Sequence, residues 1–162
     1  MAQLRKILLV DDDDDLREAL SEQLVLTEDF DVFEARTGAE GMEKTKAGLF
    51  DLVILDNRLP HRSGLELLKS AREQGLSSKV ILMTAYGTID SAVLAMKEGA
   101  SDYLTKPFSM DELLLLVKRL LRMKQLEEEN LSLRKRVEER YGLEGLVGKS
   151  DPMLKIYELI ET

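Results

Sequence analysis

Short apolar runs and amphipathic stretches alternate along the first part of the chain. Five of the runs are rich in Leu, Ile and Val and are too short for helices, so each predicts a β-strand. Three of them are apolar without alternation, which is typical of parallel strands that are covered on both faces. The five predicted strands are Lys6–Val10, Phe30–Ala35, Leu52–Leu55, Lys79–Met83 and Tyr103–Thr105.

The stretches between these strands carry apolar residues at helical spacing. Thr37 and Ser109 each precede a Glu in the capping-box pattern, and Gly48, Gly75 and Gly99 follow predicted helix ends. The alternation of strand and helix predicts an α/β domain built on a doubly wound, five-stranded parallel sheet. The apolar stripes of the predicted helices lie within Leu16–Leu24, Met42–Leu49, Leu65–Ala71 and Ile89–Met96.

A last helix is predicted to start at Ser109 and to run to about residue 140, since no Gly or Pro interrupts it before Tyr141 and Gly142. A helix of this length extends beyond what one small domain needs. Its second half carries a heptad pattern of the kind found in coiled coils. The positions that would face a partner helix are Met123, Leu126, Asn130, Leu133 and Val137.

The heptad pattern predicts a parallel coiled-coil dimer, in which Asn130 is the buried polar residue that fixes the register. Two observations keep an alternative open, a charged single helix that connects two domains. Arg119 occupies the preceding core position, and the repeat is short. Opposite charges flank the predicted seam in the pairs Arg122 with Glu127 and Glu129 with Arg134.

We therefore divide the chain into a domain of residues 1–122, a helical dimerisation linker of residues 123–141 and the start of a further domain in residues 142–162. The last part begins a helix at Ser150, Asp151 and Pro152 and then shows an apolar stripe. A lone helix of this size is marginal in water, so we expect its packing partner to lie outside this sequence.

Composition narrows the functional classes. Residues 1–117 carry 13 basic and 22 acidic side chains, a net charge of −9 that disfavours contact with nucleic acid. The chain has no Cys and one His, His61, which excludes thiolate chemistry and multi-histidine metal sites. No segment approaches the roughly 18 apolar residues that a membrane span needs. We expect a cytoplasmic protein whose chemistry depends on carboxylates.

Carboxylates and two other polar groups follow the predicted strands. Asp11 and Asp12 come directly after the first strand and Asp56 after the third. Open α/β sheets bind ligands at this edge, where adjacent carboxylates attract a divalent cation. Thr84 and Lys106 follow the fourth and fifth strands, and a Lys and a hydroxyl beside a cation can bind a tetrahedral oxyanion.

Together these motifs resemble the receiver domain of two-component response regulators, over residues 1–122. The matching stretches are ILLVDDD, LVILDNRLPHRSG, ILMTAYG and GASDYLTKPF. The resemblance implies a flavodoxin-like fold with five parallel strands and five helices. It also implies a signalling domain that catalyses only its own phosphoryl transfer and dephosphorylation.

The resemblance further implies a role for each polar residue. Asp56 would be the phosphoacceptor for a partner histidine kinase. Asp11 and Asp12 would bind Mg²⁺ together with Asp56 and the backbone carbonyl of Arg58. The residues expected to contact the phosphoryl group are Thr84 and Lys106, and the switch residues are Thr84 and Tyr103.

Residues 143–162 are similar to the opening of the AAA+ ATPase domain in NtrC-type activators of sigma-54-dependent transcription. The similarity rests on the stretch VGKSDPMLKI, in which V-G-x-S-x-x-M precedes an aliphatic position. It implies a homodimer whose dimer state changes when Asp56 is phosphorylated and which controls an ATPase domain of the same protein.

Two other classes of function remain open from the residues alone. One is an aspartyl-phosphate phosphohydrolase of the HAD kind, which also uses a strand-end Asp. That family places a second Asp two residues after the nucleophile, where this chain has Arg58. The other is an interaction module whose acidic pocket is inert, and acyl-phosphate labelling separates it from a receiver.

Overall fold

A parallel sheet organises the first part of the chain. The computed structural model describes the backbone of residues 4–85 and 87–145 and the side chains of residues 4–85 and 87–137. Residues as far as Lys124 form one compact unit, and a second unit begins at Gln125. The strands in the described residues are β1 (Arg5–Val10), β2 (Phe30–Ala35), β3 (Leu52–Asp56), β4 (Lys79–Thr84) and β5 (Asp102–Thr105).

The strand order is β2-β1-β3-β4-β5, and all neighbouring pairs are parallel. Val10 at the end of β1 pairs with Leu55 in β3, and Thr84 at the end of β4 pairs with Thr105 at the end of β5. The carboxyl ends of all five strands therefore lie at one edge of the sheet.

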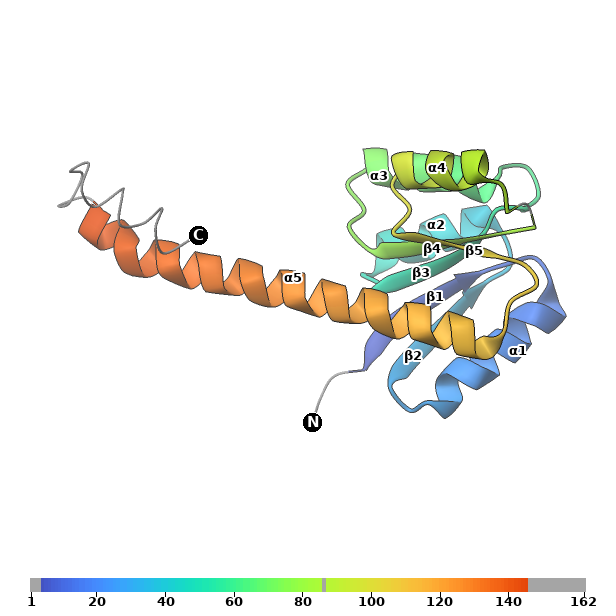
Figure 1. Cartoon of the computed structure of the whole chain (residues 1–162), viewed down its shortest axis with the longest axis horizontal. Helices are drawn as coiled ribbons and strands as arrows, with labels where there is room; N and C mark the ends of the chain where they lie inside the picture. Colours follow the sequence, from blue (N-terminus) through green and yellow to red (C-terminus); the bar gives the residue numbers. More distant parts are fainter. Residues whose placement is uncertain (1–3, 86, 146–162) are drawn as a thin grey trace. The chain divides into compact units, whose positions relative to one another are not determined.

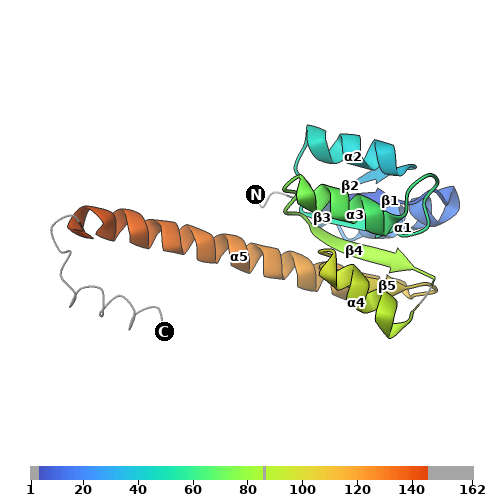
Figure 2. The ribbon, with the colours of Figure 1, turned by 90° about the horizontal axis from the view of Figure 1, so that it is seen from above.

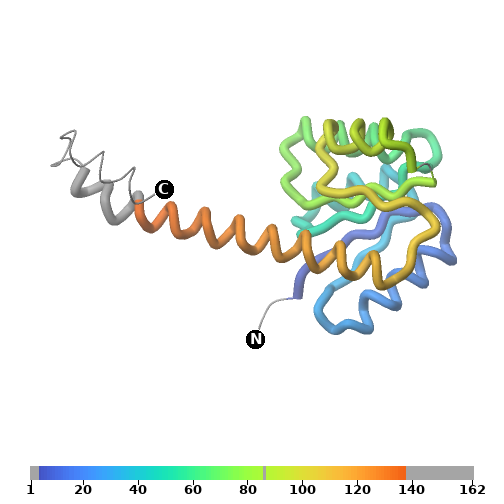
Figure 3. Tube along the Cα trace, in the orientation of Figure 1, coloured from blue at the N-terminus to red at the C-terminus, as the bar shows by residue number. Residues whose placement is uncertain are grey.

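Helices cover both faces of this sheet. The helices are α1 (Asp14–Leu26), α2 (Gly38–Ala47), α3 (Gly64–Glu73), α4 (Ile89–Lys97) and α5 (Met110–Gly145). The first turns of α5 lie with α1 on one face, and α2, α3 and α4 lie on the other (Figure 1). Figure 2 shows α3 between α2 and α4, and the Cα trace in Figure 3 shows the same two layers.

Alternate residues of the buried strands supply two separate cores. Ile7 and Ile54 pack with Leu24 of α1 on one face, whereas Leu8 and Val53 pack on the face of α3. Successive strand residues point to opposite faces, so a strand covered on both sides must be apolar throughout. This explains why the first, third and fourth predicted strands show no alternation.

The predicted strands are confirmed to within one residue at each end, but the predicted stripe of the second helix is wrong at its end. The helix stops at Ala47, and Gly48 has an extended backbone with φ of −159°. The chain then buries Phe50 in the core and leaves Leu49 83% exposed. Leu49 is apolar but follows the helix and does not belong to its buried face.

The predicted apolar stripe of α4 is also not a core stripe. Ala95 is the buried residue of this helix, whereas Ile89 is 82% exposed and Val93 and Met96 are close to half exposed. α4 contacts the sheet through a small side chain, and its larger apolar side chains therefore remain at the surface.

Helix α5 begins as predicted and ends later than predicted. The backbone N–H of Glu112 donates to the Ser109 hydroxyl at 3.1 Å, which caps the first turn. The helix then continues through Tyr141 and Gly142 to Gly145. An interior Gly costs a helix about 1 kcal/mol, which a long helix tolerates. The rest of the predicted ATPase segment, residues 146–162, lies outside the described residues. Among the helices that the structure describes, none has the length and apolarity to cross a membrane.

Candidate functional site

The site lies at the carboxyl edge of the sheet, where β1 and β3 end side by side. Asp11 follows β1, and Asp56 is the last residue of β3. Both strands are held in place by their apolar residues on both faces, so the backbone of each Asp is fixed by the core. Asp11 is 1% exposed and Asp56 is 4% exposed. Asp12 is exposed at the mouth of the pocket.

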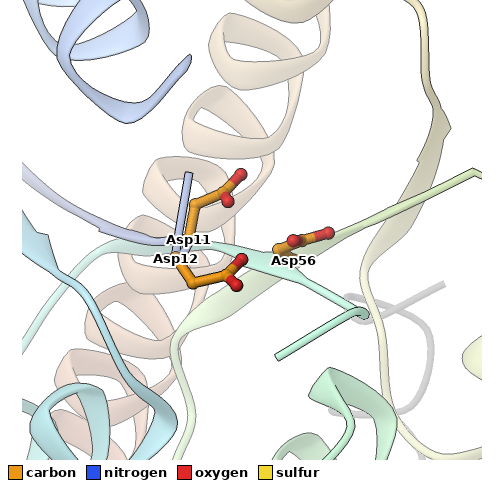
Figure 4. Close-up of side chains that lie close together, drawn as sticks. All are labelled: Asp11, Asp12 and Asp56. Carbon is orange, nitrogen blue, oxygen red and sulfur yellow. The ribbon is translucent and has the colours of Figure 1, made fainter. Parts of the chain in front are cut away.

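Asp11, Asp12 and Asp56 each offer a carboxylate oxygen, and these oxygens all lie within 4.8 Å of one another. Figure 4 shows the three side chains gathered at the ends of their strands. Three hard oxygen donors with two buried members are chemically suited to Mg²⁺, which binds through one or two carboxylates and keeps several waters. The sequence prediction that these residues converge is therefore correct in geometry.

Lys106 supplies the positive charge of the pocket. Its Nζ atom lies 3.2 Å from an oxygen of Asp56 and 3.4 Å from an oxygen of Asp11. The residue follows β5, where the backbone N–H of Lys106 donates to the carbonyl of Thr84 at 2.7 Å. Thr84 ends β4, next to β3, and is 4% exposed. The fold thus brings the predicted Lys and Thr to the same edge as the carboxylates.

Burial raises the pKa of the Asp56 carboxyl above its ordinary value, and the nearby charge of Asp11 raises it further. Lys106 and a hydrogen bond from the backbone N–H of Arg58 act in the opposite direction and do not cancel the rise. A bound cation would stabilise the ionised form of such a carboxyl group, because a nearby opposite charge favours ionisation. The contact of Arg58 is through its N–H, and the role of its carbonyl as a metal ligand stays a prediction.

Tyr103, the predicted switch residue, lies on β5 and is half-buried. Its hydroxyl is 3.2 Å from the hydroxyl of Ser91 on α4, and Ser91 also contacts the carbonyl of Thr88 at 3.0 Å. The aromatic ring packs on the core beneath α4. Sequence reasoning missed Ser91, because a Ser at a helix start reads as a capping residue.

Arg17 is a second residue that sequence reasoning missed. It is 4% exposed and hydrogen-bonds to the backbone carbonyl of Asp11 at 2.8 Å. A signal was available, since Arg17 stands at helical spacing with Leu20 and Leu24 on the buried face of α1. A charged residue in such a stripe needs partners, and only the folded structure identifies them.

The residues of the predicted linker are exposed in the single chain. Met123, Leu126, Leu133 and Val137 are between 39% and 58% exposed, and Asn130 is also exposed. On the side of α5 that packs against the sheet, the side chains of Leu120 and Leu121 are buried. The predicted pairing of two such helices stays a prediction.

The fold and the acidic pocket together define a doubly wound α/β domain with a cluster of carboxylates at the carboxyl edge of its parallel sheet. The sequence profile of the response regulator receiver domain matches residues 7–118, and the chain belongs to this family. Receiver domains are signalling domains that bind Mg²⁺ at such an acidic pocket, and the family implies a histidine kinase as partner.

Two proteins of similar sequence support this assignment. The transcriptional regulatory protein CiaR of Streptococcus pneumoniae is 40% identical over 118 residues, which cover 72% of this chain and 51% of CiaR. The C4-dicarboxylate transport transcriptional regulatory protein DctD of Pseudomonas aeruginosa is 38% identical over 159 residues, which cover 96% of this chain and 34% of DctD. The chain spans about half of the first relative and about a third of the second.

A solved structure shares the fold. The beryllofluoride-activated NtrC4 receiver domain dimer, determined in solution, has a TM-score of 0.67 and 32% sequence identity. The match covers 73% of this chain and 97% of that chain. Dimerisation thus occurs in a structural relative.

Proposed function

We propose that this chain is the phosphorylation-dependent regulatory part of a sigma-54-dependent transcriptional activator of the NtrC type. The observation that carries the proposal is the placement of Asp56, buried between two further carboxylates and 3.2 Å from the Lys106 ammonium. Asp56 accepts the phosphoryl group from a phosphohistidine of a sensor kinase. As the bond between Asp56 oxygen and phosphorus forms, the phosphorus–nitrogen bond breaks and the imidazole keeps its electron pair.

When bound, Mg²⁺ would be held by Asp11, Asp12, Asp56 and the Arg58 carbonyl, and it would neutralise charge on the phosphoryl oxygens. Lys106 then exchanges its pairing with Asp56 for a phosphoryl oxygen, since an ammonium binds phosphate as a point charge. Thr84, one strand further along the edge, donates its hydroxyl to another phosphoryl oxygen.

The signal is a shift between two populations of the domain. A phosphoryl group brings about −1.5 to −2 charges and new acceptors to the pocket. When the Thr84 side chain turns toward the phosphoryl group, it leaves the space beside β5. Tyr103 can then move inward into that space. The Tyr103 hydroxyl then leaves Ser91, which changes the position of α4.

The linker carries this change toward a downstream ATPase domain. We infer that residues 123–141 pair two chains in parallel through Leu126, Asn130 and Leu133, and that residues 142–162 begin the ATPase domain. The similarity to DctD supports this part of the proposal, because an alignment over 159 residues must extend well past the receiver domain. Exposed Leu126 and Leu133 also favour a covering partner helix.

Intact-mass measurement after incubation with acetyl phosphate tests the proposal. The chain should gain one phosphoryl group in the presence of Mg²⁺ and none in EDTA, and Asp56→Asn should gain none because an amide is not a competent nucleophile. Rapid release of inorganic phosphate from simple phosphate esters would favour the phosphohydrolase alternative. No labelling under any condition would favour an inert acidic module.

A further inference from the structure

Arg17 is the one basic residue that is buried in the described part of the chain. It lies on α1, and its side chain is only 5% exposed. A guanidinium keeps its charge in proteins, so its burial is tolerated when it is paired with opposite charge and hydrogen-bonded. The partners of Arg17 therefore indicate what the residue is placed there to hold.

Three different groups accept hydrogen bonds from the Arg17 guanidinium. Nη1 donates to the backbone carbonyl of Asp11 at 2.8 Å, Nη2 to a carboxylate oxygen of Asp14 at 2.6 Å, and Nε to a carboxylate oxygen of Glu34 at 3.0 Å. Asp14 begins α1, and Glu34 lies on β2. Arg17 thus ties the turn between β1 and α1 to the neighbouring strand.

The bond to the Asp11 carbonyl is the informative one. This carbonyl belongs to the peptide unit that joins Asp11 to Asp12, and a planar peptide contains the Cα atoms of both residues. A donor that fixes the carbonyl therefore fixes the plane from which both side chains project. On the other side of the turn, the backbone N–H of Asp13 donates to the Asp11 side chain at 2.9 Å.

From this arrangement we infer that Arg17 is a positioning residue for the Mg²⁺ site, holding Asp11 and Asp12 in the orientation that binds the cation. The inference rests on the proposed function, because it assumes that Asp11, Asp12 and Asp56 bind Mg²⁺. Partners in the shell around metal ligands commonly contribute 10- to 100-fold to metal affinity by fixing ligand orientation.

The action of Arg17 is geometric. Its positive charge would by itself repel a cation, and the carboxylates of Asp14 and Glu34 compensate that charge locally. Arg17→Lys keeps the charge but carries all its donors on one nitrogen, whereas the three acceptors of Arg17 are served by three different nitrogens of its planar fork. A geometric role predicts that Arg17→Lys and Arg17→Met weaken Mg²⁺ binding alike.

A matched control exists on the opposite side of the sheet. Arg72 of α3 also directs a guanidinium at backbone carbonyls, with Nη2 donating to Gly99 at 2.8 Å and Nη1 to Leu76 at 2.7 Å. Gly99 and Leu76 precede β5 and β4 at the amino edge, away from the acidic pocket. Arg72→Met removes a clamp of the same kind without touching the turn between β1 and α1.

The experiment measures the Mg²⁺ dissociation constant by titration calorimetry on the full chain after chelation of all metal, with urea unfolding of the same samples. We expect Arg17→Met to raise this constant by about tenfold or more. Arg72→Met should lower stability and leave the Mg²⁺ dissociation constant unchanged, because Arg72 contacts none of the proposed metal ligands.

Two results would overturn the inference alone: an unchanged dissociation constant in Arg17→Met while its stability falls, or full recovery of Mg²⁺ binding in Arg17→Lys. Failure of the unsubstituted chain to bind Mg²⁺ would overturn the proposed function and this inference with it. Should Arg17→Met fail to fold, Glu34→Ala provides the test. This variant removes the acceptor of Nε together with one compensating charge. Glu34→Gln is its control, because it removes the same charge and keeps an oxygen acceptor. A rise in the Mg²⁺ dissociation constant in Glu34→Ala and not in Glu34→Gln supports the inference, and equal constants in the two variants contradict it.

Discussion

Replacement of Asp56 by Asn is expected to stabilise the fold in metal-free buffer at neutral pH. The carboxylate of Asp56 is buried and lies within 4.8 Å of oxygens on Asp11 and Asp12. At an effective dielectric constant of about 20, each such pair repels by at least about 3.5 kcal/mol at this separation, and Lys106 at 3.2 Å returns about 5 kcal/mol.

Solvent around exposed Asp12 weakens one of these repulsions, and the lost hydration of buried Asp56 adds a further cost to its charge. We expect Asp56→Asn to raise the free energy of unfolding by about 1–3 kcal/mol. The amide oxygen still accepts a hydrogen bond from Lys106, so the substitution removes charge with little change of shape.

Urea unfolding in EDTA and in Mg²⁺ measures this effect. Mg²⁺ at 100 times its dissociation constant should stabilise the unsubstituted chain by about 2.7 kcal/mol and Asp56→Asn by much less. The cation therefore reduces the difference in stability between the two chains. A lower stability of Asp56→Asn in EDTA would refute the reasoning, because it would show that the Asp56 charge is a net stabilising partner of Lys106.

The difference in stability between Asp56→Asn and the unsubstituted chain depends on pH, because burial and the charge of Asp11 raise the pKa of Asp56. The folded chain takes up this proton at a higher pH than the unfolded chain, so the unsubstituted chain gains stability as pH falls through the raised pKa toward the ordinary value of about 3.9. The advantage of Asp56→Asn should therefore be largest at neutral pH and shrink on acidification.

Three further predictions concern the ligand, the backbone around the acceptor and the dimer. Asp12→Ala should lose most Mg²⁺ affinity in calorimetry while remaining at least as stable in EDTA, because it removes a like charge from the pocket; a large loss of metal-free stability would mark Asp12 as a structural partner instead. A methyl group on Gly64 would overlap the backbone carbonyl oxygen of Asp56. Gly64→Ala should therefore lower the free energy of unfolding in urea by about 1–3 kcal/mol and slow phosphorylation. An unchanged stability would contradict that contact. Leu126→Asp combined with Leu133→Asp should convert a dimer to a monomer in sedimentation equilibrium without preventing phosphorylation of Asp56. A persistent dimer would place the contact on the exposed apolar face of α4 at Ile89 and Val93.

The strands and the acidic pocket could be predicted from the sequence for a simple physical reason. Strands buried on both faces leave uninterrupted apolar runs, and parallel strands end at the same edge of the sheet. Asp11 and Asp56 meet there because β1 and β3 are neighbours. Leu49 and Ile89 show where this reasoning fails. Helical spacing marks which apolar residues share a face but cannot tell whether a layer of the fold covers that face.

Polar partners were harder to predict than apolar ones. Arg17 and Ser91 act through hydrogen bonds to groups that are distant in sequence or on another element, namely Glu34 and Tyr103. Such bonds depend on the orientation of single side chains, which periodicity does not encode. The end of α5 was missed for a different reason, since one Gly costs too little to stop a long helix.

The identity of the phosphorylated residue tests the central claim most directly. The chain is incubated with acetyl phosphate and Mg²⁺, the acyl phosphate is reduced with borohydride, and peptides are sequenced by mass spectrometry. Reduction converts a phosphorylated Asp to homoserine and leaves other residues unchanged. The account predicts homoserine at position 56, in Mg²⁺ and not in EDTA. Homoserine at Asp11 or Asp12, or a stable phosphoryl group on another residue with Asp56 unmodified, would contradict it.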